Sequence, residues 1–114
     1  MIVHSRPTLS EADAQAVARV VLSGKIAQGE EGAAFERELA AFGGQRGTVA
    51  VSSGTAALHL GLLALGVGPG AEVVIPTYVC DALHHAVSHA GAVPVLADAE
   101  AATLSLDPDD VKRR

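Results

Sequence analysis

Apolar and polar residues alternate with the period of an α-helix over residues 10–43. Ser10 has the character of a helix N-cap, and Asp13, three residues further on, completes a weak capping box. An apolar stripe follows and runs to a serine–glycine pair; it consists of Ala14, Val17, Val21 and Leu22. After a glycine-bearing loop over residues 25–32, a second helix ends at two glycines; its apolar face carries Phe35, Leu39 and Phe42. We therefore predict two consecutive amphipathic helices.

From residue 48 onward, short apolar segments alternate with helical ones. Three segments are short and apolar enough to be strands buried in a sheet; they are residues 48–52, 73–75 and 93–97. Leucines recur at helical spacing over residues 55–65, and Asp81 stands where it could cap a further helix. Alternation of strand and helix is typical of parallel βαβ units, which right-handed crossovers connect. We therefore predict an α/β fold.

Composition and charge narrow the classes of function. The chain has 114 residues, of which 49% are hydrophobic, so it can form a core within one domain at most. A formal net charge of −5, with only 8 lysines and arginines, argues against nucleic-acid binding, which needs a basic face. Cys80 is the single cysteine and fits a reducing compartment, and no apolar run is long enough for a membrane span. We expect a soluble, cytoplasmic protein that binds neither nucleic acid nor membrane.

Ligands of parallel sheets bind at the carboxyl ends of the strands, and residues 52–56 and 76–81 meet that condition. In the first segment, Gly54, Thr55 and Ala56 would begin a helix. The first backbone N–H groups of a helix lack intrahelical partners and attract phosphate. The same segment can equally be only a helix cap and a tight turn, and the local pattern does not decide between the two interpretations. Neither the P-loop motif nor the dinucleotide-binding glycine motif is present.

The histidines are weaker candidates for chemistry. His85 and His89 lie four residues apart and could share a helix face, a spacing that can bind a metal. No carboxylate or thiol completes the set, so packing or exposure to solvent is the favoured interpretation, and we expect no metal site.

Three segments resemble, in order and in spacing, the N-terminal part of the DegT/DnrJ/EryC1/StrS aminotransferases. They are SSGTAALHL at residues 52–60, GPGAEVVIP at 68–76 and AGAVPVLAD at 90–98. The upstream segments LSGKIAQG at 22–29 and FERELA at 35–40 also resemble the opening of the family, so the resemblance covers nearly the whole chain. Members of this family are pyridoxal-phosphate (PLP) enzymes of fold type I that mostly aminate keto-sugars attached to nucleotides.

The resemblance implies the βαβαβ portion of the large domain of a fold-type-I PLP-dependent transferase, preceded by two N-terminal helices. Residues 1–32 would form the N-terminal helix and loop segment, and residues 33–114 a partial PLP-binding α/β domain. In the resembled fold, the first strand lies at an edge of a larger sheet, and strands from later in the sequence separate it from the second. The strands predicted at 48–52 and 73–75 would then have unpaired edges. A small complete domain would instead place the three strands side by side.

By the same resemblance, Gly54, Thr55 and Ala56 would bind the phosphate of the cofactor. The family usually places an aromatic residue after the second strand, stacked on the pyridine ring. The corresponding residue here is Cys80, so this chain departs from the family pattern. Either Cys80 packs on the ring, or Tyr78 approaches it, since the two would share a face in an extended segment.

PLP catalysis needs a lysine that forms a Schiff base, and the resemblance places that lysine beyond Arg114. The only lysines here are Lys25 and Lys112, and neither has the expected context. We therefore expect part of an enzyme that carries the cofactor phosphate site, supplies no catalytic residue and is inactive alone. The complete enzyme would transfer an amino group from an amino-acid donor to a nucleotide-linked keto-sugar, as a homodimer. The alternative is a non-catalytic truncated remnant, or a small module that binds a phosphorylated ligand or pairs with a chain supplying the missing segment.

Overall fold

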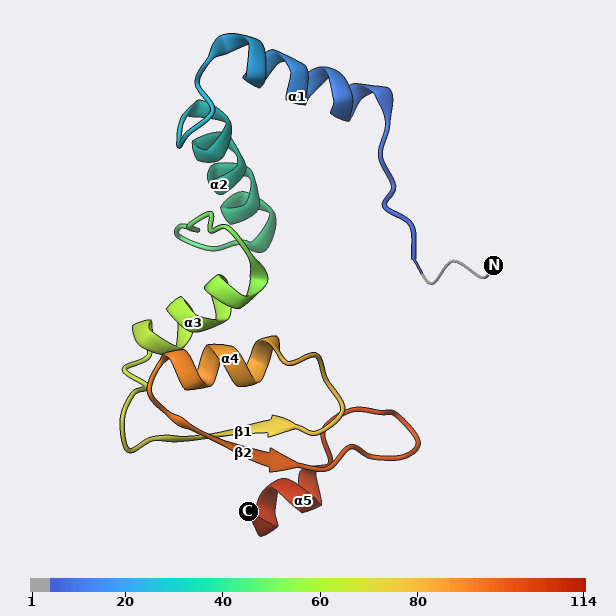
Figure 1. The fold of residues 1–114 in the computed structure, drawn as a ribbon, viewed down its shortest axis with the longest axis vertical. Helices are drawn as coiled ribbons and strands as arrows, with labels where there is room; N and C mark the ends of the chain where they lie inside the picture. Colours follow the sequence, from blue (N-terminus) through green and yellow to red (C-terminus); the bar gives the residue numbers. More distant parts are fainter. Residues whose placement is uncertain (1–4) are drawn as a thin grey trace. The chain divides into compact units, whose positions relative to one another are not determined.

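The computed structural model describes residues 5–114, which form two compact units that divide between Ala50 and Val51 (Figure 1). The first unit contains the helices α1 (Glu11–Ser23) and α2 (Glu30–Gly43). The second contains, in chain order, α3 (Gly54–Ala64), β1 (Glu72–Pro76), α4 (Ala82–His89), β2 (Val93–Ala97) and α5 (Pro108–Arg113). None of these helices combines the length and hydropathy that crossing a bilayer requires. The predicted division at residue 32 rests on the family resemblance and stays a prediction.

Local capping interactions fix the ends of α1, as the sequence predicts. The Asp13 N–H donates to Ser10 Oγ at 3.4 Å, and the Ser10 N–H donates to Asp13 Oδ2 at 2.7 Å, so the capping box is formed. Gly24 ends the helix in the left-handed conformation, with a φ of 69°, where a residue without Cβ is favoured. Gly44 ends α2 in the same conformation. The two predicted helices are confirmed, and α2 begins at Glu30, inside the predicted loop.

Residues 48–52 do not form the strand that the sequence predicts. The Thr48 hydroxyl donates to Glu36 O at 2.6 Å, and the Ala50 N–H donates to Glu36 Oε1 at 2.8 Å. The Ala50 N–H thus donates to a side chain of α2, whereas in a sheet it would donate to a neighbouring strand. A strand needs a partner along its edge, and the two strands within residues 5–114 pair with each other. The prediction was wrong because an apolar run favours an extended chain but supplies no partner.

The second unit contains one parallel βαβ unit in place of the predicted βαβαβ. β1 and β2 lie side by side, with Ile75 opposite Leu96, and α4 joins them and packs against both strands (Figure 1). Ile75, Val87 of α4 and Ala92 form a small buried cluster. Half-buried apolar residues pack around it; they are Leu62, Val67, Ala71, Val73 and Leu83. The α/β class is confirmed, as are the strands predicted at 73–75 and 93–97.

The turn between α4 and β2 requires a glycine at residue 91. Gly91 has a φ of 79°, and a Cβ there would lie 3.2 Å from Pro69 Cγ and 3.6 Å from Pro69 N. The turn over residues 68–70 therefore packs directly on Gly91, next to the buried Ala92. Gly66 has a similar φ of 76° but faces open space, with no atom within 4 Å of its would-be Cβ.

We predict that Gly91→Ala destabilises the second unit more than Gly66→Ala does. Both substitutions place a Cβ in the left-handed region, at a cost of about 1–2 kcal/mol. Only Gly91→Ala also pushes against Pro69, so the free energy of unfolding should fall further. Urea unfolding followed by circular dichroism measures both changes. If the free energy of unfolding falls equally in the two variants, the contact of residue 91 with Pro69 does not contribute to the destabilisation.

Asp110 attaches α5 to the end of β2. Asp110 is 6% exposed, and its Oδ2 accepts the Asp98 N–H at 2.7 Å. Arg113 and Arg114 pair with the same carboxylate, at 3.1 and 2.9 Å. The Asp98 N–H, followed by the arginines, stabilises the charged form and holds the pKa of Asp110 down at about 2.

This low pKa predicts the pH window in which Asp110 stabilises the fold. Because its folded pKa of about 2 lies below the ordinary value of 3.8, the stabilisation is complete above about pH 5. It is lost as the pH falls from about 4 through 2. Asp110→Asn should therefore lower the free energy of unfolding at pH 6, and its difference from the parent chain should shrink towards pH 2. Urea unfolding at a series of pH values measures this difference.

Asp109→Asn is the matched control for that series, because Asp109 is an exposed neighbour whose carboxylate pairs with Lys112 at 2.9 Å. Exposed pairs of this kind contribute little, so the control should stay close to the parent chain at every pH. A deficit of Asp110→Asn that stays constant down to pH 2 would mean that the charge of Asp110 is not the source of its effect.

Candidate functional site

The first turn of α3 brings together the three residues predicted to bind phosphate. Ser53 is the N-cap, in extended backbone, and Gly54, Thr55 and Ala56 begin the helix. The N–H groups of Gly54 and Thr55 donate no hydrogen bond within residues 5–114, so both donors are available to a ligand. The positive end of the helix dipole lies at the same point and favours an anion.

The third predicted donor is engaged by the chain itself. The Ala56 N–H donates to Ser53 Oγ at 3.1 Å, and the Ala57 N–H donates to Ser53 O at 3.0 Å. The segment is therefore a true helix cap, as one of the two interpretations of the sequence holds, and it still leaves two donors open. A bound phosphate would reach Ala56 only by displacing the Ser53 hydroxyl. A serine three residues before Ala56 is a signal from which this competition could have been predicted.

Tyr78 and Cys80, the other two predicted cofactor-binding residues, follow β1. Tyr78 is 70% exposed, and Cys80 is an exposed free thiol. The chain bends over residues 77–79, so the extended conformation in which the two side chains would share a face is not formed. Within residues 5–114, no hydrogen bond joins this segment to the first turn of α3. The predicted residues thus fall into two groups, one at the start of α3 and one after β1.

The carboxyl ends of β1 and β2 meet at Thr77 and Asp98. The Thr77 N–H donates to Ala97 O at 2.9 Å, and the Thr77 hydroxyl donates to Asp98 Oδ1 at 3.3 Å. The Ala99 N–H donates to the same oxygen at 2.8 Å. The sequence predicts a ligand-binding segment over residues 76–81 but assigns no role to Thr77. A polar residue directly after a buried strand is the signal that points to it.

Asp81 and three histidines line the neighbouring helices without forming a metal site. The Asp81 side chain does not cap α4, contrary to the role suggested by the sequence; its Oδ2 lies 3.3 Å from His85 Nε2. The ring of His89 lies 5.8 Å from that of His59 on α3 and 6.2 Å from that of His85, measured between centroids. In the described part of the chain, no three histidine, cysteine or acidic side chains are arranged to hold a metal ion.

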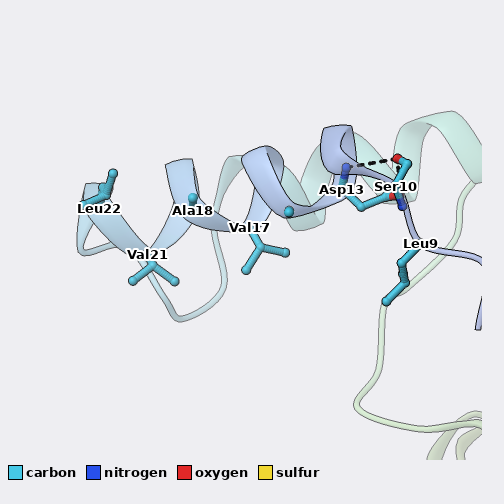
Figure 2. A pocket seen from close by; sticks show the side chains of 8 residues that line it. Leu9, Ser10, Asp13, Val17, Ala18, Val21 and Leu22 are labelled. Carbon is cyan, nitrogen blue, oxygen red and sulfur yellow. Dashed lines mark hydrogen bonds between the residues drawn. The ribbon is translucent and has the colours of Figure 1, made fainter.

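An apolar hollow of about 610 Å³ lies along one face of α1 (Figure 2). The residues that line it are Leu9, Ser10, Asp13, Ala14, Val17, Ala18, Val21 and Leu22. The two polar members, Ser10 and Asp13, are bonded to each other. The hollow is therefore lined mainly by apolar side chains, and none of the predicted cofactor-binding residues lines it.

Comparison with known proteins identifies relatives along nearly the whole chain. The model of the DegT/DnrJ/EryC1/StrS aminotransferase family matches residues 7–114. The spore coat polysaccharide biosynthesis protein SpsC of Bacillus subtilis is 40% identical over 105 residues, which are 92% of this chain and 27% of that protein. The 3-amino-5-hydroxybenzoate synthase of Amycolatopsis mediterranei is 46% identical over 83 residues, which are 73% of this chain and 21% of that protein.

Solved structures agree with the sequence comparison. A Streptococcus pneumoniae protein assigned as a sugar aminotransferase, Spr1654, has been solved in its PLP form. It matches with a TM-score of 0.88 at 37% identity, over 98% of this chain and 29% of that one. This chain spans about a quarter of the length of such relatives, at their N-terminal part. The resemblance to the family, the α/β class of the fold and PLP as the cofactor of the family are confirmed. The chain belongs to the DegT/DnrJ/EryC1/StrS aminotransferase family.

Proposed function

We propose that this chain carries the phosphate half of the cofactor site of a PLP-dependent aminotransferase. The observation that carries the proposal is the start of α3, where the Gly54 and Thr55 N–H groups are open at the positive end of the helix. Two further features support it. A Cβ at Gly54 would meet no atom within 4 Å, so the space beside this residue is open, and Thr55 adds a hydroxyl-bearing side chain to the same turn.

The residues of this chain can bind the phosphate group of the cofactor, but they do not supply the lysine that its chemistry requires. When bound, PLP supplies an electron sink for the substrate, and the protein supplies its orientation and a lysine. Of the two lysines, Lys112 lies on α5 and its Nζ donates to Asp109 Oδ1 at 2.9 Å, and Lys25 lies in the loop after α1. We therefore assign binding of the phosphate and approach to the ring to Gly54, Thr55, Ala56, Tyr78 and Cys80. We assign no catalytic residue to the chain.

We also propose the substrates and assembly of the whole enzyme. It would transfer an amino group from an amino-acid donor to a nucleotide-linked keto-sugar, and it would act as a homodimer in the cytoplasm. The name of SpsC, a polysaccharide biosynthesis protein, and the assignment of Spr1654 support a sugar substrate. The name of 3-amino-5-hydroxybenzoate synthase indicates a different product in the same family, so the substrate has to be measured.

A non-catalytic phosphate-binding module is the second candidate function. The observation in its favour is that the second unit, which holds the open donors of α3, has its own buried cluster around Ile75 and Val87. Such a unit should unfold cooperatively as a small discrete species and bind a phosphorylated ligand. A part that needs the rest of an enzyme should instead aggregate or unfold without a cooperative transition.

We predict that Thr55→Val weakens the binding of inorganic phosphate and of PLP by about tenfold, because each loses one hydrogen bond to a charged group. Isothermal titration calorimetry of the 114-residue chain measures both affinities. Thr103→Val is the matched control, because the Thr103 hydroxyl is exposed and bonds to Glu100 at 2.7 Å. Unchanged affinity in Thr55→Val would reduce the start of α3 to a helix cap.

We predict that the 114-residue chain alone catalyses no amino transfer, because the family resemblance places the Schiff-base lysine beyond Arg114 and Lys112 is paired with Asp109. The assay is the release of 2-oxoglutarate from glutamate with a nucleotide-linked keto-sugar and added PLP. Full-length Spr1654, which is assigned as a sugar aminotransferase, serves as the reference for detection. Turnover by the purified chain, with no other protein present, would refute the assignment of a site without a catalytic lysine.

A further inference from the structure

A continuous series of hydrogen bonds joins α5 to the segment that follows β1. The Asp110 carboxylate accepts the Asp98 N–H at 2.7 Å, and the Asp98 carboxylate accepts the Thr77 hydroxyl at 3.3 Å. The series therefore runs through Asp98, which uses its backbone on one side and its side chain on the other. It connects Asp110 with Thr77, which lie far apart in the sequence but within the second unit.

The α5 end of this series is the most firmly held part of it. Asp110 is the one buried charged residue in the described chain, and its two oxygens accept bonds from Arg113, Arg114 and the Asp98 N–H. No buried side-chain nitrogen or oxygen within residues 5–114 lacks a partner. Because these hydrogen bonds fix the orientation of the buried Asp110 carboxylate, they also fix the backbone of Asp98, which donates to it.

The other end of the series holds Thr77 at two points. Its N–H donates to Ala97 O at 2.9 Å and its hydroxyl bonds to Asp98, so both backbone and side chain are tied to the end of β2. Thr77 is the last residue held in this way before the exposed Tyr78 and Cys80. The direction in which the chain leaves β1, and hence the place of both side chains, depends on these contacts.

We propose that Asp110, acting through Asp98 and Thr77, is a positioning residue that holds the Tyr78–Cys80 segment where it can approach the pyridine ring of the cofactor. The proposal rests on the proposed function, because it takes the ring to lie at this segment. The phosphate end of the cofactor is held separately, by the start of α3. Loosening the series should therefore weaken binding of the ring and leave binding of the phosphate unchanged.

Thr77→Val is the decisive variant, because it removes the hydroxyl from the series while Asp110 keeps its bonds to the Asp98 N–H and to the two arginines. We expect amide hydrogen exchange over residues 77–81 to become about fivefold faster. The affinity for PLP should fall about fivefold, because the segment that approaches the ring loses the Thr77–Asp98 hydrogen bond that holds it. The affinity for inorganic phosphate should match that of the parent chain, and the urea midpoint should fall only slightly, because the lost bond is exposed. If Asp110 only stabilises the fold, Thr77→Val should change neither the exchange rate over residues 77–81 nor the affinity for PLP.

Asp110→Asn tests the far end of the series, and Thr103→Val and Asp109→Asn are the matched controls. Asp110→Asn should reproduce the loss in PLP affinity without a loss in phosphate affinity, and the controls should show neither. The proposal is overturned if Thr77→Val leaves both the exchange rate and the PLP affinity at parental values. It is also overturned if PLP and phosphate affinities fall together. A parent chain that binds neither PLP nor phosphate refutes the proposed function itself, and the positioning role with it.

Discussion

The packing of Ile75 against Val87 and Ala92 is the interaction on which the second unit depends. It holds α4 against the two strands, and Leu62 of α3 packs on the same cluster. A two-stranded sheet is not stable in water without such cover. Once the cluster is formed, the carboxyl ends of β1 and β2 lie side by side, and Thr77 comes within hydrogen-bonding distance of Asp98. The polar contacts at that edge are therefore a consequence of a small apolar core.

The size of that core limits what it can cover. β1 and β2 are almost wholly apolar, as strands buried on both faces are, yet Val74 and Leu96 stay 36% and 51% exposed. In the first unit, Leu22 and Phe42 are 87% and 92% exposed. Apolar surface on this scale is typical of faces that another segment or another chain covers. The relatives, more than three times as long, have the additional chain from which such cover can come.

Elements that depend on local interactions could be predicted from the sequence, and those that depend on distant partners could not. The ends of α1 follow from Ser10, Asp13 and Gly24, which lie within one turn of the positions that they cap. The strand predicted at 48–52 failed because its partner is not encoded in its own residues, and Glu36 took its donor instead. The burial of Asp110 has no local signal either, since only the folded chain brings Asp98 to it. For the site, the sequence indicated the start of α3 but not the competition of Ser53 for Ala56.

The two groups of proposed cofactor contacts also differ in whether they depend on local interactions or on distant partners. The donors at the start of α3 are oriented by a single helix and need nothing outside it, whereas the segment after β1 is oriented by α5 through Asp98. Binding of the phosphate should therefore survive changes that disturb binding of the ring. The pKa of Asp110, about 2, keeps its carboxylate charged throughout the physiological range, so the series that orients Thr77 is not interrupted by ordinary changes of pH. Any dependence of ring binding on pH near neutrality must then come from the cofactor or from other groups, and not from this attachment.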